Sequence, residues 1–257
     1  YSLVVATMAS LLLYLQACRR ESRALLADAP DIVVQRVRGG RHELAPTDRA
    51  DVIRRIRGVV GVTPRVWGYS FDPPTGATLT FWGADSVPGD VLECADPWPV
   101  DGDVENGCLV GSGLAELRFL GIGDRFPIRS FDGTLFAPRV AGVFTSASAL
   151  LTNDLVVLPT TDLRRVFGID DSLCTDIAVE VHNSNEIDNV ARKVLEQWPD
   201  ARAITRRQVL QTYDALFDWR GGLWAACLMG CVAAFAILVW EKGTGLTEEE
   251  VHTIGLL

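Results

Sequence analysis

Residues 205–257 read TRRQVLQTYDALFDWRGGLWAACLMGCVAAFAILVWEKGTGLTEEEVHTIGLL, and the rest of the chain is organised around this stretch. Its middle, Gly221 to Trp240, has 20 residues without a charge. A helix of that length rises about 30 Å, the thickness of a bilayer core. Tryptophans near both ends suit the membrane–water boundary. We therefore predict a transmembrane helix over 219–240. A buried helix of a soluble domain is the weaker alternative, because such helices seldom stay uncharged for so long.

A helix is also predicted on the N-terminal side of this segment. Thr205 and Gln208 fit a capping box, in which each residue bonds the other's backbone N–H. The apolar positions that follow keep helical spacing over a stalk at 206–218. Neither proline nor a turn cluster separates the stalk from 219–240, so one rigid helix is expected to carry motion across the interface.

A short capped helix is predicted on the other side, within 241–257. Thr247 and Glu250 form a second capping box there. A helix this short is not stable alone in water, so it requires a partner surface. Its candidate contact residues are Thr247, Glu248, Glu249, Glu250, Val251, Ile254, Gly255 and Leu257.

The first 18 residues, YSLVVATMASLLLYLQAC, carry no charge and predict most of a first transmembrane helix over 1–18. Since Tyr1 is not an initiator methionine, we expect a fragment with further segments on both sides. A lipoprotein signal ending at Cys18 is the alternative, but Gln16 fits that motif poorly. In the second span, small residues recur at every fourth position, which favours close helix packing in lipid unless the spacing is chance. These residues are Gly222, Ala226, Gly230 and Ala234.

About 200 residues lie between the two spans, enough for one or two folded domains. Two patterns of strand, helix and strand occur far apart, one in 19–83 and one in 171–205. In the first, a Thr47-capped helix running to Val60 is expected. Together the patterns predict one split β-α-β domain. Residues 84–170 alternate short apolar runs with turns and predict a β-rich insert. The predicted fold class is thus α+β, flanked by two transmembrane helices.

Three phrases in this order carry a family resemblance: GSGLAELRFLGIGDRFPI, VAGVFTSASALLTNDLVVLP and WEKGTGLTEEEVHTIGLL. With the predicted layout, they resemble FtsX/MacB-like permeases of ABC transporters. The resemblance implies Porter-like and Sabre-like subdomains outside the cytoplasm and a cytoplasmic coupling helix at 241–257. It also implies a separate ATPase that binds the ATP, a second permease copy, and a place in the inner membrane of a bacterial cell. Members export substrates, release lipoproteins or control cell-wall hydrolases, so an extracytoplasmic partner or lipoprotein is expected too.

The sequence offers no catalytic, metal or cofactor site, and we predict a protein that is not an enzyme. It has no phosphate-binding loop, and Gly111-Ser112-Gly113 lacks the spacing of a nucleophile elbow. Three histidines without ligand spacing are interpreted as solvated. The acidic turn at 101–105 departs from a calcium loop. The net charge of −9 disfavours nucleic acid. Cys94 and Cys108 flank a turn-rich loop and could form a disulfide in an oxidising compartment, which would leave Cys174 over.

An alternative to the permease hypothesis is the input domain of a two-span sensor or kinase. Arg19, Arg20, Arg23 and Arg220 flank the large domain, and the positive-inside rule taken alone would place that domain in the cytoplasm. The rule is weak for long translocated domains. A sensor would continue into a signalling helix after the second span, whereas this chain has a glycine break and a short capped helix.

The apolar stripe of the last helix can be tested directly. Ile254→Asp would place a charge in a buried contact, at a cost of several kcal/mol before relaxation. In the full-length protein we expect it to abolish co-purification of the ATPase or to uncouple hydrolysis from transport, with the large domain still folded. Wild-type binding, hydrolysis and transport in this variant would favour the sensor.

Overall fold

The computed structural model describes residues 29–84, 93–94, 107–145 and 149–212, with single helical positions between 9 and 17 and between 215 and 240. The side chains of residues 93–94 and 149–151 lie outside this description. The chain divides into two compact units, residues 24–209 and residues 1–23 with 210–257.

The first sheet of the 24–209 unit is built from both ends of that unit. Among the described residues its strand order is β15-β1-β14-β4, with β2 beside β1, and all these pairs are antiparallel. Two β-α-β units interleave in this order, which is the split arrangement of ferredoxin-like folds. The elements are β1 (Ile32–Arg38), β2 (Arg41–Glu43), α2 (Arg49–Arg54), β4 (Val59–Arg65), β14 (Asp176–Val181), η1 (Ser184–Glu186), α6 (Ile187–Gln197) and β15 (Ala201–Thr205).

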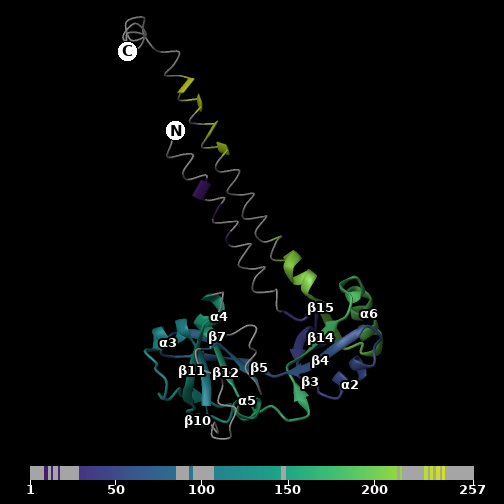
Figure 1. The fold of residues 1–257 in the computed structure, drawn as a ribbon, viewed down its shortest axis with the longest axis horizontal. Helices are drawn as coiled ribbons and strands as arrows, with labels where there is room; N and C mark the ends of the chain where they lie inside the picture. The colour runs from purple at the N-terminus through teal and green to yellow at the C-terminus, as the bar shows by residue number, and fades with distance from the viewer. Residues whose placement is uncertain are drawn as a thin grey trace, which may run out of the picture. The chain divides into compact units, whose positions relative to one another are not determined.

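The helices α2 and α6 pack against this sheet (Figure 1). The helix α2 is shorter than predicted, because Gly58 adopts φ +100° and the β-branched Val59 and Val60 begin β4. Thr47 does not cap it, since its hydroxyl donates to the carbonyl of Ser172 at 3.0 Å.

The second sheet is formed by the middle of the chain. Its strand order among the described residues is β5-β6-β12-β8-β11-β7, with mixed parallel and antiparallel pairs. Short pairs β3–β13 and β9–β10 lie outside both sheets. The remaining elements are β3 (Ala45–Pro46), β5 (Trp67–Asp72), β6 (Ala77–Gly83), β7 (Glu93–Cys94), β8 (Gly107–Gly111), α3 (Ser112–Arg118), β9 (Ile128–Arg129), β10 (Leu135–Phe136), β11 (Arg139–Thr145), α4 (Ala149–Asp154), β12 (Leu155–Leu158), α5 (Thr160–Phe167) and β13 (Leu173–Cys174).

The α+β class and the β-rich insert agree with the prediction, but the sheets meet at a different place. The sequence interpretation assigned residues up to 83 to the split domain. In the structure β4 ends at Arg65 in the first sheet, and β5 begins at Trp67 in the second. Residues 63–70 therefore do not form one strand. The chain changes sheet at Val66, which is 3% exposed.

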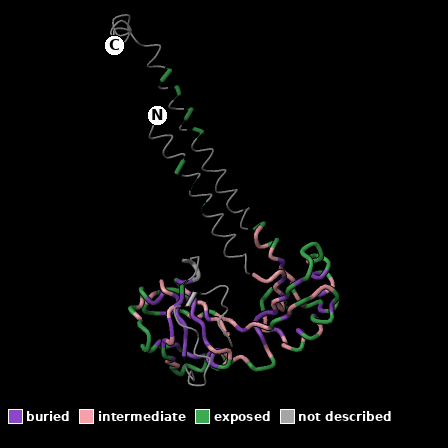
Figure 2. Tube along the Cα trace, in the orientation of Figure 1, coloured by how far each residue is buried: buried purple, intermediate pink, exposed green. Residues whose placement is uncertain are grey.

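One hydrophobic core runs through both sheets. Its buried residues include Ile32 and Val179 of the first sheet and Leu79 and Phe81 of the second. Val66, where the chain passes from one sheet to the other, belongs to the same core. Figure 2 shows the buried residues concentrated in the strands of both sheets. A smaller cluster on the other face of the second sheet contains Leu109, Phe144, Leu155 and Val157.

A buried ion pair at the edge of the first sheet also binds the start of the second. Arg65 donates two hydrogen bonds to the carboxylate of Asp176, at 2.6 and 2.8 Å. Asp176 also accepts the indole N–H of Trp67 at 2.9 Å, and its side chain is only 2% exposed. The hydroxyl of Thr175 lies 3.0 Å from the N–H and 2.8 Å from the carbonyl of Trp67. The guanidinium of Arg65 lies 5.4 Å from the centre of the Trp82 ring. The place where the chain passes from one sheet to the other, which we call the crossing, is therefore held by an ion pair, hydrogen bonds and a cation–π contact.

The other unit holds the candidate membrane segments, which lie almost wholly outside the described residues. Its described positions are helical, and Met229, Ile237 and Trp240 are exposed. Within the described residues, no helix is long and apolar enough to cross a membrane.

The ion pair at the crossing predicts a large stability effect. Arg65→Met leaves the Asp176 carboxylate buried without its cation, a change that costs about 3–5 kcal/mol in comparable pairs. We expect urea unfolding, followed by tryptophan fluorescence, to shift accordingly. The matched control is Arg192→Met, which breaks an exposed pair with Glu196 at 2.6 Å and is expected to cost about 0–1 kcal/mol. Equal losses in the two variants would show that the buried pair has no special role.

Candidate functional site

The start of the first strand and the end of the last strand of the 24–209 unit lie at the same end of the first sheet. The strand β1 begins at Ile32 and β15 ends at Thr205, and these two residues face each other in the antiparallel pair. Sequence positions more than 170 apart are therefore held side by side at this sheet end. We call this place the connection site, defined by Asp31, Val181, Asp188 and residues 205–208.

The predicted capping box is present at the connection site. The Thr205 hydroxyl accepts the N–H of Gln208 at 3.3 Å, and the Gln208 side-chain oxygen accepts the N–H of Thr205 at 3.2 Å. Thr205 is 1% exposed and is the last residue of β15, while residues 206–212 are helical. The strand therefore becomes a helix without an intervening loop.

Asp31 joins three segments of this unit. One carboxylate oxygen accepts the N–H of Val181, at the end of β14, at 2.9 Å. The other accepts the guanidinium of Arg206 at 2.5 Å, and the Asp31 carbonyl accepts the Arg206 N–H at 2.9 Å. The two side chains are 16% and 32% exposed. Because a carboxylate near a helix N-terminus also favours the helix dipole, Asp31 fixes the first turn to the sheet.

A second ion pair fixes the same turn to α6. Arg207 donates to Asp188, which lies in the first turn of α6. Both side chains are more than half exposed, so this pair contributes less than the Asp31 contact. Sequence reasoning found the capping box because it is local. It missed Asp31 and Asp188 because no local pattern marks a partner 175 or 19 positions away.

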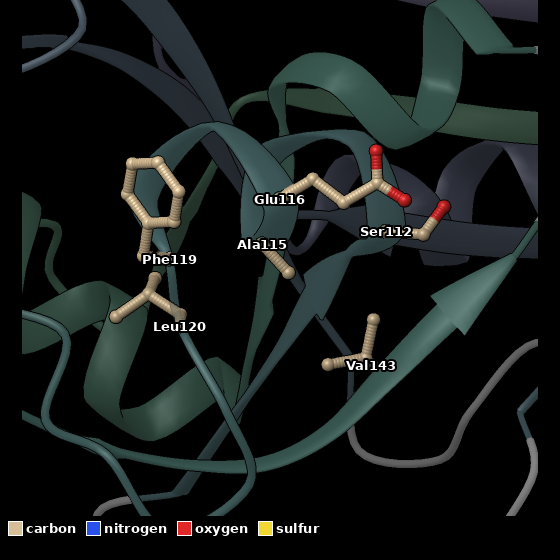
Figure 3. A pocket seen from close by; sticks show the side chains of 6 residues that line it. All are labelled: Ser112, Ala115, Glu116, Phe119, Leu120 and Val143. Atoms are coloured by element: carbon tan, nitrogen blue, oxygen red, sulfur yellow. The ribbon is translucent and has the colours of Figure 1, made fainter.

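The β-rich part of the chain carries an open hollow of about 540 Å³ beside α3 (Figure 3). Phe119 is 94% exposed and has φ +53°, a left-handed conformation that is uncommon for a residue with a side chain. An exposed aromatic ring held in this way is a candidate contact for a partner. The hollow is lined by Ser112, Ala115, Glu116, Phe119, Leu120 and Val143.

The candidate residues for chemistry make packing and backbone contacts. In Gly111-Ser112-Gly113, a Cβ at Gly111 would collide with the backbone of Thr152, so close packing explains this glycine. His42 is exposed, as expected, and its ring also stacks on Trp67 and lies 2.9 Å from the carbonyl of Thr175. Among the described residues, no cluster of three or more His, Cys, Asp or Glu side chains could hold a metal.

The proposed Cys94–Cys108 disulfide is wrong in this structure. Cys108 is a free, buried cysteine of β8. Cys94 pairs with Phe144 on one side of β11, and Cys108 pairs with Val140 on its other side. Two strand spacings, about 9.6 Å, therefore separate them even before their offset along β11. Disulfides need Cα atoms within about 7 Å.

Several predicted site residues lie outside the described residues. They are Gly222, Ala226, Ala234, Thr247, Glu248, Glu249, Glu250, Val251, Ile254, Gly255 and Leu257, together with the acidic turn at 101–105 and His252. Gly230 is described as helical and exposed, and an added Cβ would meet no described atom within 4 Å. Its packing against another helix stays a prediction.

A split β-α-β domain with a β-rich insert, whose two ends leave from neighbouring strands, suits an extracytoplasmic domain carried between two membrane segments. The family model described as "MacB-like periplasmic core domain" matches residues 2–197, and the chain belongs to this family. It is accordingly related to the permeases of ABC transporters, which are transporter components rather than enzymes and work with an ATPase. The family also implies membrane anchoring with this domain outside the cytoplasm.

Solved structures show distant likenesses. The extracellular domain of the noncanonic ABC-type transporter YknZ from Gram-positive bacteria is 14% identical, with a TM-score of 0.45 over 68% of this chain and 99% of that one. The periplasmic region of MacB from Actinobacillus actinomycetemcomitans is 13% identical, with a TM-score of 0.48 over 71% and 92%. A domain of a permease-like protein from Porphyromonas gingivalis is 17% identical, with a TM-score of 0.36 over 65% and 79%. No curated protein matches the chain.

The two buried cysteines give a test of the fold. Burial raises the pKa of the Cys108 thiol to about 12, and burial followed by the nearby Asp176 charge raises that of Cys174 to about 11. Both thiols therefore stay protonated at pH 8, and reaction with iodoacetamide requires the thiolate. We expect neither to be alkylated in the folded chain and both to be alkylated in guanidinium chloride, as measured by peptide mass spectrometry. Rapid alkylation of Cys108 in the folded protein would contradict this strand packing.

Proposed function

We propose that the chain is a permease subunit that transmits ATP-driven motion from a cytoplasmic ATPase to its extracytoplasmic domain. The protein lies in the inner membrane of a bacterial cell. The transmitted motion drives export or the release of a lipoprotein or peptide outside the cytoplasm. This proposal goes beyond family membership, because it assigns a mechanical role to particular residues.

The connection site is the observation that supports this role most. The two segments leading to the predicted spans end on paired residues, Ile32 and Thr205. Asp31 holds the first helical turn through Arg206 and holds β14 through Val181. A shift of one predicted span relative to the other would therefore act directly on neighbouring strands. A flexible linker would absorb such a shift, but residues 206–212 are helical directly after the last residue of β15.

A shift of the first sheet would reach the second through the crossing at Val66. Asp176 of β14 holds Arg65 of β4 and the indole of Trp67, the first residue of β5. These contacts are buried and charge-assisted, so they resist separation. The two sheets would then respond together, and the β-rich part would carry the motion outward.

At the cytoplasmic end, the coupling helix at 241–257 would contact the ATPase. Val251, Ile254 and Leu257 provide its apolar stripe, and Gly255 would allow close approach. Glu248, Glu249 and Glu250 would favour the helix start that Thr247 caps. The small residues of 219–240 would pack against another membrane helix, surrounded by lipid.

On the outside, the hollow beside α3 is the proposed contact for an extracytoplasmic partner or lipoprotein. Its apolar lining and the exposed Phe119 ring suit an apolar side chain of the partner. A second permease copy, which the family resemblance implies, would complete the assembly.

The connection site can be tested by Asp31→Ala in the full-length permease with its ATPase. This change removes the carboxylate that accepts Arg206 and Val181, contacts that contribute about 1.5–3 kcal/mol each when charged. With fluorophores attached at Asp132→Cys of both copies, we expect the ATP-dependent change in energy transfer to fall at least threefold while hydrolysis continues.

Arg192→Ala, which removes an exposed pair within α6, is the matched control and is expected to keep the full signal. An undiminished ATP-dependent change in Asp31→Ala would rule out the connection site as the transmitting element. Loss of hydrolysis together with the signal would instead place Asp31 in assembly of the complex.

A further inference from the structure

The strand β5 forms an exposed edge of the second sheet. Its only strand neighbour among the described residues is β6. Tyr69 and Phe71 point to the same face, because their positions differ by two, and they are 61% and 62% exposed. Large aromatic side chains on an open sheet edge are unusual for a strand that faces only water.

The backbone of β5 also directs hydrogen-bonding groups outward. The N–H and carbonyl of Trp67 both contact the Thr175 hydroxyl, and thus face away from β6. Because these directions alternate along a strand, the N–H and carbonyl groups of Tyr69 and Phe71 face the same outer edge. Within the described part of the chain, those four groups have no backbone partner.

The edge lacks the features that normally protect an exposed strand. The segment Trp67–Phe71 reads WGYSF, without charge or proline, and it pairs with β6 without a bulge. Natural edge strands are usually blocked by lysine, proline, a bulge or a covering element. Of the residues that the structure describes, Thr175 covers the Trp67 end only, and none pairs with the outer edge of Gly68 to Asp72.

We propose that β5 pairs antiparallel with β5 of a second copy of this chain, about a twofold axis at Ser70. In this register Tyr69 of one copy lies opposite Phe71 of the other, twice over. Each opposed pair exchanges two backbone hydrogen bonds, so all four outward groups of each copy are satisfied. The aromatic rings meet on one face as cross-strand pairs, which are favourable contacts. The two six-stranded sheets then join into one.

A second copy suits this edge because the edge is complementary to itself. The net charge of −9 would repel two copies, but WGYSF carries none of it. The charged residues on either side are already paired within the chain: Arg65 with Asp176, and Asp72 with Arg118. In the proposed register each strand ends at the turn 73–76, opposite Trp67 of the other copy. This interface adds to the proposed permease dimer, and its test requires neither ATP nor transport.

Oxidative cross-linking of the full-length chain in its membrane tests the register. Ser70 would face its counterpart as a non-hydrogen-bonded pair, with Cα atoms about 4.5 Å apart, within disulfide range. We use Ser70→Cys with all native cysteines except the buried Cys108 and Cys174 changed to serine. The matched control is Thr78→Cys, exposed on β6 of the same hairpin but one strand further from the axis. We expect at least fivefold more covalent dimer from Ser70→Cys.

A charge exchange in the Ser70→Cys background tests the partner strand. Y69K/F71K places like charges across both pairs and is expected to lower the dimer at least fivefold. Y69K/F71E places opposite charges across them and is expected to restore it to within twofold. Equal dimer from Ser70→Cys and Thr78→Cys, or equal effects of the two double variants, would overturn the proposal. So would a Ser70→Cys cross-link to a different polypeptide, identified by mass.

Discussion

The fold depends on how one buried carboxylate is neutralised. Asp176 is 2% exposed, and a charge in that position is tolerated only because Arg65 and the Trp67 indole both bind it. Those three residues come from β14, β4 and β5, so satisfying the charge also fixes where one sheet ends and the other begins. The β-rich insert begins after Arg65 of β4 and ends before Asp176 of β14. The ion pair between these two residues therefore holds the two ends of the insert together.

Local patterns predicted the elements whose stability is local. The strands β1 and β15 and the helix α6 follow from their apolar periodicity, and the capping box at Thr205 follows from two residues three positions apart. The change of sheet at Val66 was not predictable in this way, since residues 63–70 have one continuous strand pattern. Contacts with residues more than 100 positions away, at Thr175 and Asp176, decide it.

The difference between local patterns and contacts distant in sequence also explains which site residues were predicted. Cys94 and Cys108 are near each other along the chain, yet β11 lies between their strands in the sheet. The composition of the loop between them does not predict this strand order. Asp31 gave no signal because a single aspartate before a strand is common, and Arg206 is 175 positions away. The exposure of Tyr69 and Phe71 was also not predictable from the sequence. Alternating aromatic residues predict a strand, but they do not indicate whether its edge is covered.

The direct passage from β15 into the helix at 206 has a consequence for rotation as well as for displacement. A loop would act as a swivel, letting a helix spin about its own axis without turning what it is attached to. Here the capping box and Asp31 hold the first turn to β15 and β1, so a rotation of the helix about its axis would twist these two strands. Sheets resist over-twisting through every strand they contain. Under the proposed transmission, rotation of this helix would therefore change the twist of the first sheet.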